Sequence, residues 1–234
     1  MRFDIMTLFP ELVSTVLGES IIGRAQKSGA IEVYAHNIRD YSKDKHRRVD
    51  DTPYGGGMGM LMSPVPIYDC FEAITSESVN PCKKRRVLFM SPGGRVFNQA
   101  DAKRLADEYD NIVILCGHYE GVDQRIIDEI VDEEISIGDF VLTGGELPAC
   151  IVSDAIARLC PGVLSDAECF EKESHSSGLL EYPQYTRPYE FHGRTVPDVL
   201  LSGHHLNIEK WRQEESLKKT MEVRPDLIKN NSKP

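Results

Sequence analysis

The sequence predicts an α/β protein whose mostly parallel sheet is covered by helices on both faces. Short apolar runs alternate with helical periodicity through the first 160 residues of the 234-residue chain, and apolar residues make up 41% of it. Strands that alternate with helices are typical of parallel sheets, and this apolar content is enough for a full core. The regular alternation ends after Pro161, so a second, smaller region follows.

Local signals indicate each element in chain order. In the helix expected at 66–74, Ile67, Cys70 and Ile74 recur on one face, and Asn98 is a candidate N-cap for the helix that runs to Asp107. Short apolar runs at 87–90, 112–116 and 135–137 suit buried strands. The expected strands are 3–8, 31–38, 87–90, 112–116 and 133–137, and the expected helices are 10–17, 20–27, 66–74, 98–107, 122–130, 147–159 and 204–221.

The region after Pro161 has a different character. Residues 165–178 are polar and acidic without a clear period, which predicts a mobile linker. A rigid aromatic segment follows at 182–188, and the helix at 204–221 offers Leu206, Trp211 and Leu217 as anchors. This tail is too small to bury a core alone, so we expect it to pack on the first domain or on a second copy.

Several classes of protein are excluded by composition. The N-terminus has no long apolar stretch of the kind found in signal peptides, and no run approaches the ~20 apolar residues of a membrane span. The six cysteines are scattered without a Cys-x-x-Cys pair, which argues against a zinc site or a disulfide scaffold and favours a reducing cytoplasm.

The net charge of −10 argues against a generic nucleic-acid coat but leaves two basic patches. The loop 39–48 carries six side chains that are or can become cationic in ten residues, and such clusters bind phosphates. A solvated loop and a solvated helix face are the alternatives at this stage. The second patch lies in the tail and comprises Lys210, Arg212, Lys218, Lys219 and Arg224.

Two glycine-flanked loops, 117–121 and 137–147, each follow an apolar run. Ligands of open α/β sheets sit at the carboxyl ends of strands, and glycine allows the backbone to approach them closely. Neither a P-loop nor a Gly-x-G-x-x-Gly dinucleotide fingerprint is present, so phosphate cradling is not expected. The loops therefore predict one pocket for an uncharged or zwitterionic small molecule.

Five segments in the same order resemble the bacterial tRNA (guanine-N1)-methyltransferase family of the SPOUT class. They are 50–60 (DDTPYGGGMGM), 116–123 (CGHYEGVD), 136–148 (SIGDFVLTGGELP), 179–188 (LLEYPQYTRP) and 200–205 (LLSGHH), and the match extends to Trp211 and Arg212. Any one of these motifs is weak evidence. Together they cover nearly the whole chain.

The resemblance implies a SPOUT-type α/β domain with a C-terminal trefoil knot, S-adenosylmethionine as methyl donor, and a homodimer. The implied reaction moves a methyl group to N1 of guanosine at tRNA position 37, with Mg²⁺ assisting at a site that the sequence does not identify. The domains then become a knotted donor-binding domain at 1–164, a flexible linker at 165–181 and a helical tRNA-binding domain at 182–234.

The donor pocket is expected at the ends of three strands. Backbone groups of Gly117 and of 137–142 would bind adenine and ribose, and Glu120 would meet the sulfonium charge, hold a metal, or be only an exposed loop carboxylate. The expected donor-binding residues are Met90, Ser91, Pro92, Gly117, Tyr119, Glu120, Gly121, Ile137, Gly138, Asp139, Phe140, Val141, Leu142, Gly144, Gly145 and Pro148.

Two catalytic residues follow from matching the family pattern. Arg158 corresponds to the arginine that stabilises charge on guanine O6, although Asp154 lies four residues earlier and offers an ordinary helix-surface pair. Glu173 takes the place of the family's aspartate base and is longer by one methylene, with Glu171 and His175 as competitors. The alternative function is a non-catalytic tRNA-binding protein on the same fold.

Overall fold

The computed structural model describes residues 1–164, 173–175 and 178–230, so most of the expected linker, including Glu171, lies outside the described residues. The chain divides into two compact units, residues 1–165 and 166–234. The proposed division at 164 and 181 stays a prediction.

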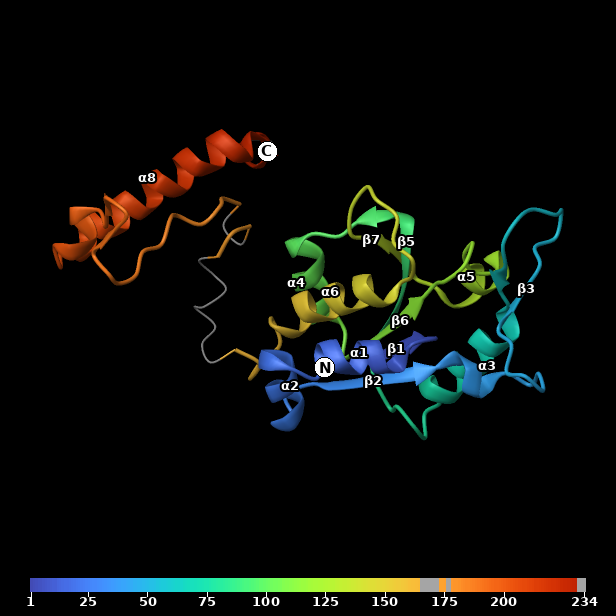
Figure 1. Cartoon of the computed structure of the whole chain (residues 1–234). Coiled ribbons are helices and arrows are strands. Elements are labelled where there is room, and N and C mark those ends of the chain that lie inside the picture. The colour runs from blue at the N-terminus through green and yellow to red at the C-terminus, as the bar shows by residue number, and fades with distance from the viewer. Residues whose placement is uncertain (165–172, 176–177, 231–234) are drawn as a thin grey trace. The chain divides into compact units, whose positions relative to one another are not determined.

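A five-stranded sheet forms the centre of the first unit (Figure 1). The strands stand in the order β2-β1-β6-β5-β7, and every neighbouring pair is parallel. The predicted α/β class and parallel sheet are therefore confirmed. The strands are β1 (Arg2–Thr7), β2 (Glu32–Asn37), β5 (Arg85–Val96), β6 (Asn111–Cys116) and β7 (Glu133–Ser136).

Helices cover both faces of this sheet, and each face has its own apolar cluster. The central strand β6 is buried along its whole length, as its uninterrupted apolar run requires. Its Ile112 and Ile114 face one cluster, whereas Val113 and Leu115 face the other, because successive side chains point to opposite faces. One face carries α1 (Pro10–Leu17), α2 (Ser20–Lys27), α4 (Gln99–Glu108) and α6 (Glu146–Ala157), and the other carries α3 (Pro64–Thr75), α5 (Gln124–Ile130) and the 3₁₀ turn η1 (Ile38–Tyr41).

The N-terminus of α4 bears out the expected cap. The Asn98 side chain accepts from the backbone N–H groups of Ala100 and Asp101, and the Asp101 carboxylate accepts from the Asn98 N–H. This reciprocal capping box satisfies donors that a helix start leaves unpaired. The expected start at Asn98 is thus correct to within one residue.

Two regions differ from expectation. Strand β5 does not stop at Met90: it breaks its pairing with β7 between Met90 and Arg95 and then resumes. Gly94 permits this return, because a Cβ there would lie 2.5 Å from the carbonyl carbon of Glu134 in β7. The stretch expected to be one loop at 39–59 also contains part of η1 and the short strand β3 (Asp50–Asp51), which pairs with β4 (Leu61–Met62).

The second unit contains the hairpin β8 (Glu190–Phe191) and β9 (Arg194–Thr195), the turn η2 (Asp198–Leu201), and helices α8 (His205–Val223) and α9 (Pro225–Asn230). Leu206 and Leu217 were expected as anchors of α8, but they are exposed on this chain. Thr220 is the buried residue instead, and its hydroxyl accepts from the Leu180 N–H at 2.9 Å. The sequence did not reveal Thr220 as a buried residue, because a threonine held by hydrogen bonds does not contribute to an apolar periodicity.

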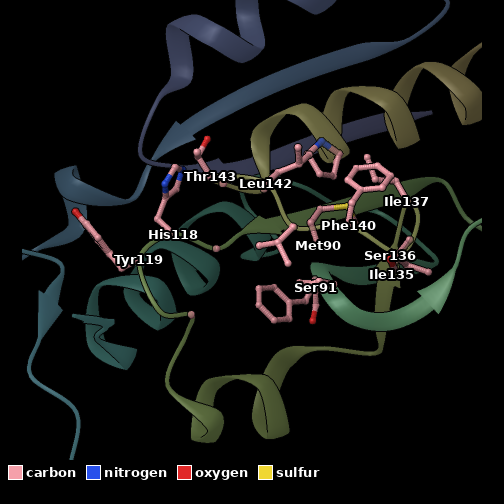
Figure 2. A pocket seen from close by; sticks show the side chains of 18 of the residues that line it. Met90, Ser91, His118, Tyr119, Ile135, Ser136, Ile137, Phe140, Leu142 and Thr143 are labelled. Carbon is pink, nitrogen blue, oxygen red and sulfur yellow. The ribbon is translucent and has the colours of Figure 1, made fainter. Parts of the chain in front are cut away.

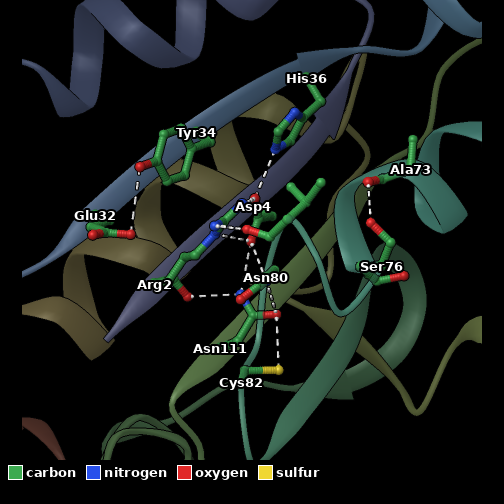
Figure 3. Close-up of polar contacts among 12 residues, drawn as sticks. Arg2, Asp4, Glu32, Tyr34, His36, Ala73, Ser76, Asn80, Cys82 and Asn111 are labelled. Carbon is green, nitrogen blue, oxygen red and sulfur yellow. Dashed lines mark hydrogen bonds and ion pairs between the residues drawn. The ribbon is translucent and has the colours of Figure 1, made fainter.

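The buried carboxylate of Asp4, near the start of β1, makes hydrogen bonds to residues of neighbouring strands (Figure 3). Asp4 is fully buried and accepts from the Arg2 guanidinium twice at 2.8 Å, from Asn80 and Asn111, and pairs with His36 Nε2 at 2.8 Å. Burial works to raise the pKa of Asp4, but the hydrogen bonds from His36, Arg2 and Asn111 outweigh it, so the pKa is lowered. This network is structural: its groups satisfy one another.

Candidate active site

A pocket of about 270 Å³ opens at the carboxyl ends of the neighbouring strands β6, β5 and β7 (Figure 2). Its walls are the loop after β6, the turn that interrupts β5, and the glycine loop between β7 and α6. His118 and Tyr119 lie at one end of the pocket in Figure 2, and Ile137 and Phe140 lie at the other. This is where a parallel sheet is expected to bind its ligand.

The two glycine loops are in direct contact. The Gly145 N–H donates to the Gly117 carbonyl at 3.0 Å, and a Cβ on Gly145 would lie 2.7 Å from the Cys116 Cα. Real carbon contacts lie near 3.5–4.0 Å, so only glycine permits this approach. Gly145 therefore fixes the separation of the two walls of the pocket.

The first turn after β7 is organised by the Ser136 hydroxyl. Its Oγ donates to the Gly138 carbonyl at 2.9 Å and accepts from the Gly138 N–H at 3.2 Å. Gly138 has a φ of +147°, and a Cβ there would lie 2.6 Å from the Phe140 ring. The ring of Phe140 thus packs on Gly138, while one of its faces remains available to the pocket.

The structure brings together nearly all the residues expected to bind the donor. Those that line the pocket are Met90, Ser91, Pro92, Gly117, Tyr119, Glu120, Gly121, Ile137, Phe140, Val141, Leu142, Gly144, Gly145 and Pro148. Gly138 and Asp139 do not line it. Gly138 lies against the Phe140 ring, and Asp139 is exposed outside the cavity.

Sequence reasoning missed five residues that also line the pocket, and it missed Glu146, which contacts one of them, His118. The five are Phe89, His118, Ile135, Ser136 and Thr143. His118 Nε2 lies 2.7 Å from Glu146 Oε2, and Glu146 Oε1 accepts from Thr7 Oγ1 at 2.6 Å. Glu146 is 3% exposed. Polar types flanking the glycines were the available signal, but no spacing rule joins residues 7, 118 and 146.

The buried Glu146 acts on two neighbouring thiols. Burial, and then the Glu146 charge, raise the pKa of Cys150 to about 11 and that of Cys116 well above its ordinary value. Both thiols therefore stay protonated near neutral pH, as expected for small core residues rather than nucleophiles.

Tyr119 is held in an uncommon backbone conformation. Its φ is +59°, in the left-handed region that residues with a side chain rarely adopt. Its hydroxyl accepts from Arg39 Nη2 at 3.3 Å, which links the pocket rim to the basic loop 39–48. Strain of this kind concentrates at functional sites, where surrounding structure enforces it.

Gly59, at the end of the glycine segment 55–59, and the residues after it lie against the loop that carries Glu120. The Glu120 N–H donates to the Met60 carbonyl at 3.0 Å, and the Met62 N–H donates to the Gly121 carbonyl at 2.9 Å. A Cβ on Gly59 would lie 2.5 Å from Glu120 Cγ and Oε1, so the carboxylate leans over that glycine. Glu120 lines the pocket while remaining solvent-exposed, so the donor-charge role stays a prediction.

The two predicted catalytic residues lie in different units. Arg158 ends α6 as its C-cap and is half-buried, whereas Glu173 belongs to the second unit and is also half-buried. His175 is exposed, with a φ of +74°. Their catalytic roles stay predictions.

The basic loop 39–48 is partly neutralised by two of its own carboxylates and by Asp69 of α3. Arg47 pairs with Asp40 at 3.0 Å, Arg48 with Asp44 at 3.0 Å, and Lys43 with Asp69 at 2.7 Å. These exposed pairs are weak. Lys45 and His46 make no ion pair among the described residues and remain exposed.

Within the described ranges, no three His, Cys, Asp or Glu side chains gather closely enough to hold a metal ion. The same ranges contain no helix long and apolar enough to cross a membrane.

Comparison with known proteins identifies the family. The family model described as tRNA (Guanine-1)-methyltransferase TrmD matches residues 1–230. A tRNA (guanine-N(1)-)-methyltransferase of Ruminiclostridium cellulolyticum is 60% identical over 228 residues, covering 97% of this chain and 96% of the relative. The protein of the same name from Clostridioides difficile is 55% identical over 233 residues, covering 99% of each.

The chain thus belongs to the tRNA (guanine-1)-methyltransferase family, and the resemblance noted in the sequence is confirmed.

Proposed function

We propose that this protein transfers a methyl group from S-adenosylmethionine to N1 of guanosine at position 37 of tRNA. The observation that carries the proposal is the glycine-walled pocket at the carboxyl ends of β5, β6 and β7, in a chain whose relatives are named for this reaction. The alternative of a non-catalytic tRNA-binding protein has no support, because the relatives are named as transferases and the pocket is intact.

The pocket suits the donor through its backbone. Gly117, Gly144 and Gly145 line the pocket without side chains, so an adenosyl moiety can come close to the main chain there, and Phe140 lines it with an aromatic ring. When bound, S-adenosylmethionine supplies a methyl group on a positively charged sulfur. The loops orient that group and exclude water from it, which is the positioning that a direct displacement requires.

The remaining chemistry concerns the guanine. N1 must lose its proton, and Glu173 accepts it in this proposal. Charge then builds on O6, where the fixed donors of the Arg158 guanidinium stabilise it. Because glutamate is longer than the family's aspartate, Glu173→Asp should retain transfer, whereas Glu173→Gln should lose it.

An exposed apolar surface on α1 and α6 favours a homodimer. Leu12 and Val16 of α1 are 39% and 49% exposed, and Leu147 and Ile151 of α6 are 50% and 52% exposed. The two helices pack against each other, so these side chains form one face, and such faces mark association sites. Sedimentation should give a dimer, and Ile151→Asp should shift the protein to monomer.

Other features of the family complete the proposal. They are a trefoil knot in the C-terminal half of the first domain, a flexible linker at 165–181, a helical tRNA-binding domain at 182–234, assistance by Mg²⁺, and a cytoplasmic location where tRNA is modified. Protease digestion across 165–181 tests the linker, and methyl transfer after chelation tests the cation.

The decisive experiment uses labelled S-adenosylmethionine and tRNA transcripts with guanosine or adenosine at position 37. Label should enter only the guanosine transcript, and nucleoside digestion should give 1-methylguanosine rather than a ribose-methylated product. Single-turnover rates for Arg158→Ala and Glu173→Gln should fall at least about 100-fold. Tight tRNA binding without incorporation by the wild type would refute the proposal.

A further inference from the structure

We propose that His118 and Glu146 form a positioning pair that holds the two glycine loops at the spacing required by the methyl donor. The inference rests on the proposed function, since it assigns a role within the same pocket. It concerns two residues that act through the loops rather than on the reacting atoms.

Glu146 is placed to hold a negative charge inside the protein. It is 3% exposed and lies in the first turn of α6, where the helix dipole favours a carboxylate. Its two oxygens are each satisfied, Oε1 by the Thr7 hydroxyl at 2.6 Å and Oε2 by His118 Nε2 at 2.7 Å. Removing either partner would leave a buried carboxylate oxygen without a hydrogen bond, which costs stability.

The pair joins the two walls of the pocket. His118 belongs to the loop after β6, and Glu146 follows directly on the glycine loop after β7. The same walls are joined by the backbone bond from Gly145 to Gly117. The bond between Gly145 and Gly117 joins the two backbones. The contact between His118 and Glu146 joins side chains of the same two walls.

Gly144, which lies between the two walls, leaves room for the contact between His118 and Glu146. A Cβ on Gly144 would lie 2.2 Å from His118 Cε1 and 2.7 Å from Glu146 Oε2. Gly144 has an ordinary φ, so its lack of a side chain serves space and not backbone conformation. The Phe9 ring, with its centroid 5.0 Å from that of His118, further restricts the imidazole.

His118 is therefore a positioning residue with one nitrogen already committed. Its ring lines the pocket, and its Nε2 is engaged by Glu146. If the pair only stabilised the fold, its loss would lower the melting temperature and leave donor affinity unchanged. If it sets the loop spacing, donor affinity must fall as well.

The test measures affinity for S-adenosylhomocysteine by calorimetry, without tRNA, together with thermal unfolding. His118→Phe keeps a ring beside Phe9 but removes the imidazole nitrogen that hydrogen-bonds to Glu146. Glu146→Gln keeps the size and shape of the side chain but removes its charge. His118→Gln keeps a hydrogen-bonding N–H group near the position of Nε2. His36→Phe is the matched control, because it removes the imidazole that pairs with the buried Asp4 at 2.8 Å, and His36 does not line the pocket.

We expect His118→Phe to weaken donor binding roughly ten- to a hundred-fold, in line with the loss of a hydrogen bond to a charged group. Glu146→Gln should weaken it less, and His118→Gln should restore most of the affinity lost in His118→Phe. His36→Phe should lower the melting temperature with affinity for S-adenosylhomocysteine retained.

Wild-type affinity in both His118→Phe and Glu146→Gln, with only the melting temperature reduced, would overturn the inference. If His118→Phe does not fold, the isosteric Glu146→Gln decides the matter alone. Failure of the wild type to bind the donor is a different result, since it removes the proposed function itself.

Discussion

Replacing Gly145 by alanine gives the sharpest test of the pocket geometry. The new Cβ would lie 2.7 Å from Cys116 Cα and 3.0 Å from the Gly117 nitrogen. Both are main-chain atoms of a strand end in the core, so no side-chain rotation relieves the contact. Separation to an ordinary carbon contact requires the two loops to move apart by about 1 Å.

That movement has two measurable consequences. Overpacking of this kind costs about 1–3 kcal/mol, which lowers the melting temperature of a chain of this size by about 2–12 °C. A 1 Å misplacement of a reacting group costs on the order of 100-fold in rate. We therefore expect a large loss of single-turnover methyl transfer at saturating tRNA.

Gly93→Ala is the matched control. Gly93 also has an ordinary φ and lies beside the pocket wall, but its Cβ would meet only the Ser91 Oγ, at 3.6 Å. Stability and rate should both stay near wild type in this variant. Wild-type rate and melting temperature in Gly145→Ala itself would refute the idea that close backbone contact sets the pocket.

Three further predictions follow from the charged groups and the rim. Because the pKa of Asp4 is lowered in the folded state, its contribution to stability is present above the unfolded pKa near 3.9 and is lost as pH falls through the folded value. Urea titrations should show that Asp4→Asn removes part of the wild-type loss of stability below about pH 4, and that Asp4→Ala costs on the order of 3 kcal/mol at pH 7. Lys45→Ala should weaken tRNA binding and reduce the slope of log affinity against log salt by about 1. Lys103→Ala is the control, because the Lys103 ammonium already pairs with Asp107, and it should leave that slope unchanged. Tyr119→Gly, which relieves a positive φ, should preserve or raise the melting temperature while lowering donor affinity; a lower melting temperature would contradict the assignment of strain.

Most of the fold was predictable because its signals are local. The apolar residues that mark β1, β2, β6 and β7 and the Asn98 cap are each local signals of a few adjacent residues. The return of β5 beyond Met90 was not predictable, because it depends on Gly94 meeting a strand about forty residues later. Pairing across such a distance leaves no periodic trace.

The site divides in the same way. Glycines after strands predicted the pocket walls, since that pattern has a backbone cause. The contact between His118, Glu146 and Thr7 was missed because it joins three elements in space, and histidine beside glycine is uninformative alone. The catalytic assignments of Arg158 and Glu173 depend on resemblance, since their local sequence fits a helix end and a polar segment equally well.

The position of β1 in the sheet has a consequence for synthesis of the chain. Its partner β2 emerges from the ribosome soon after it, but its other neighbour is β6, with Arg2 paired to Asn111. At about 5–20 residues per second, that edge of the nascent strand waits about 5–20 s for its partner. An open edge is a template for wrong pairing, so newly made protein is most exposed to aggregation and to chaperone capture during this interval.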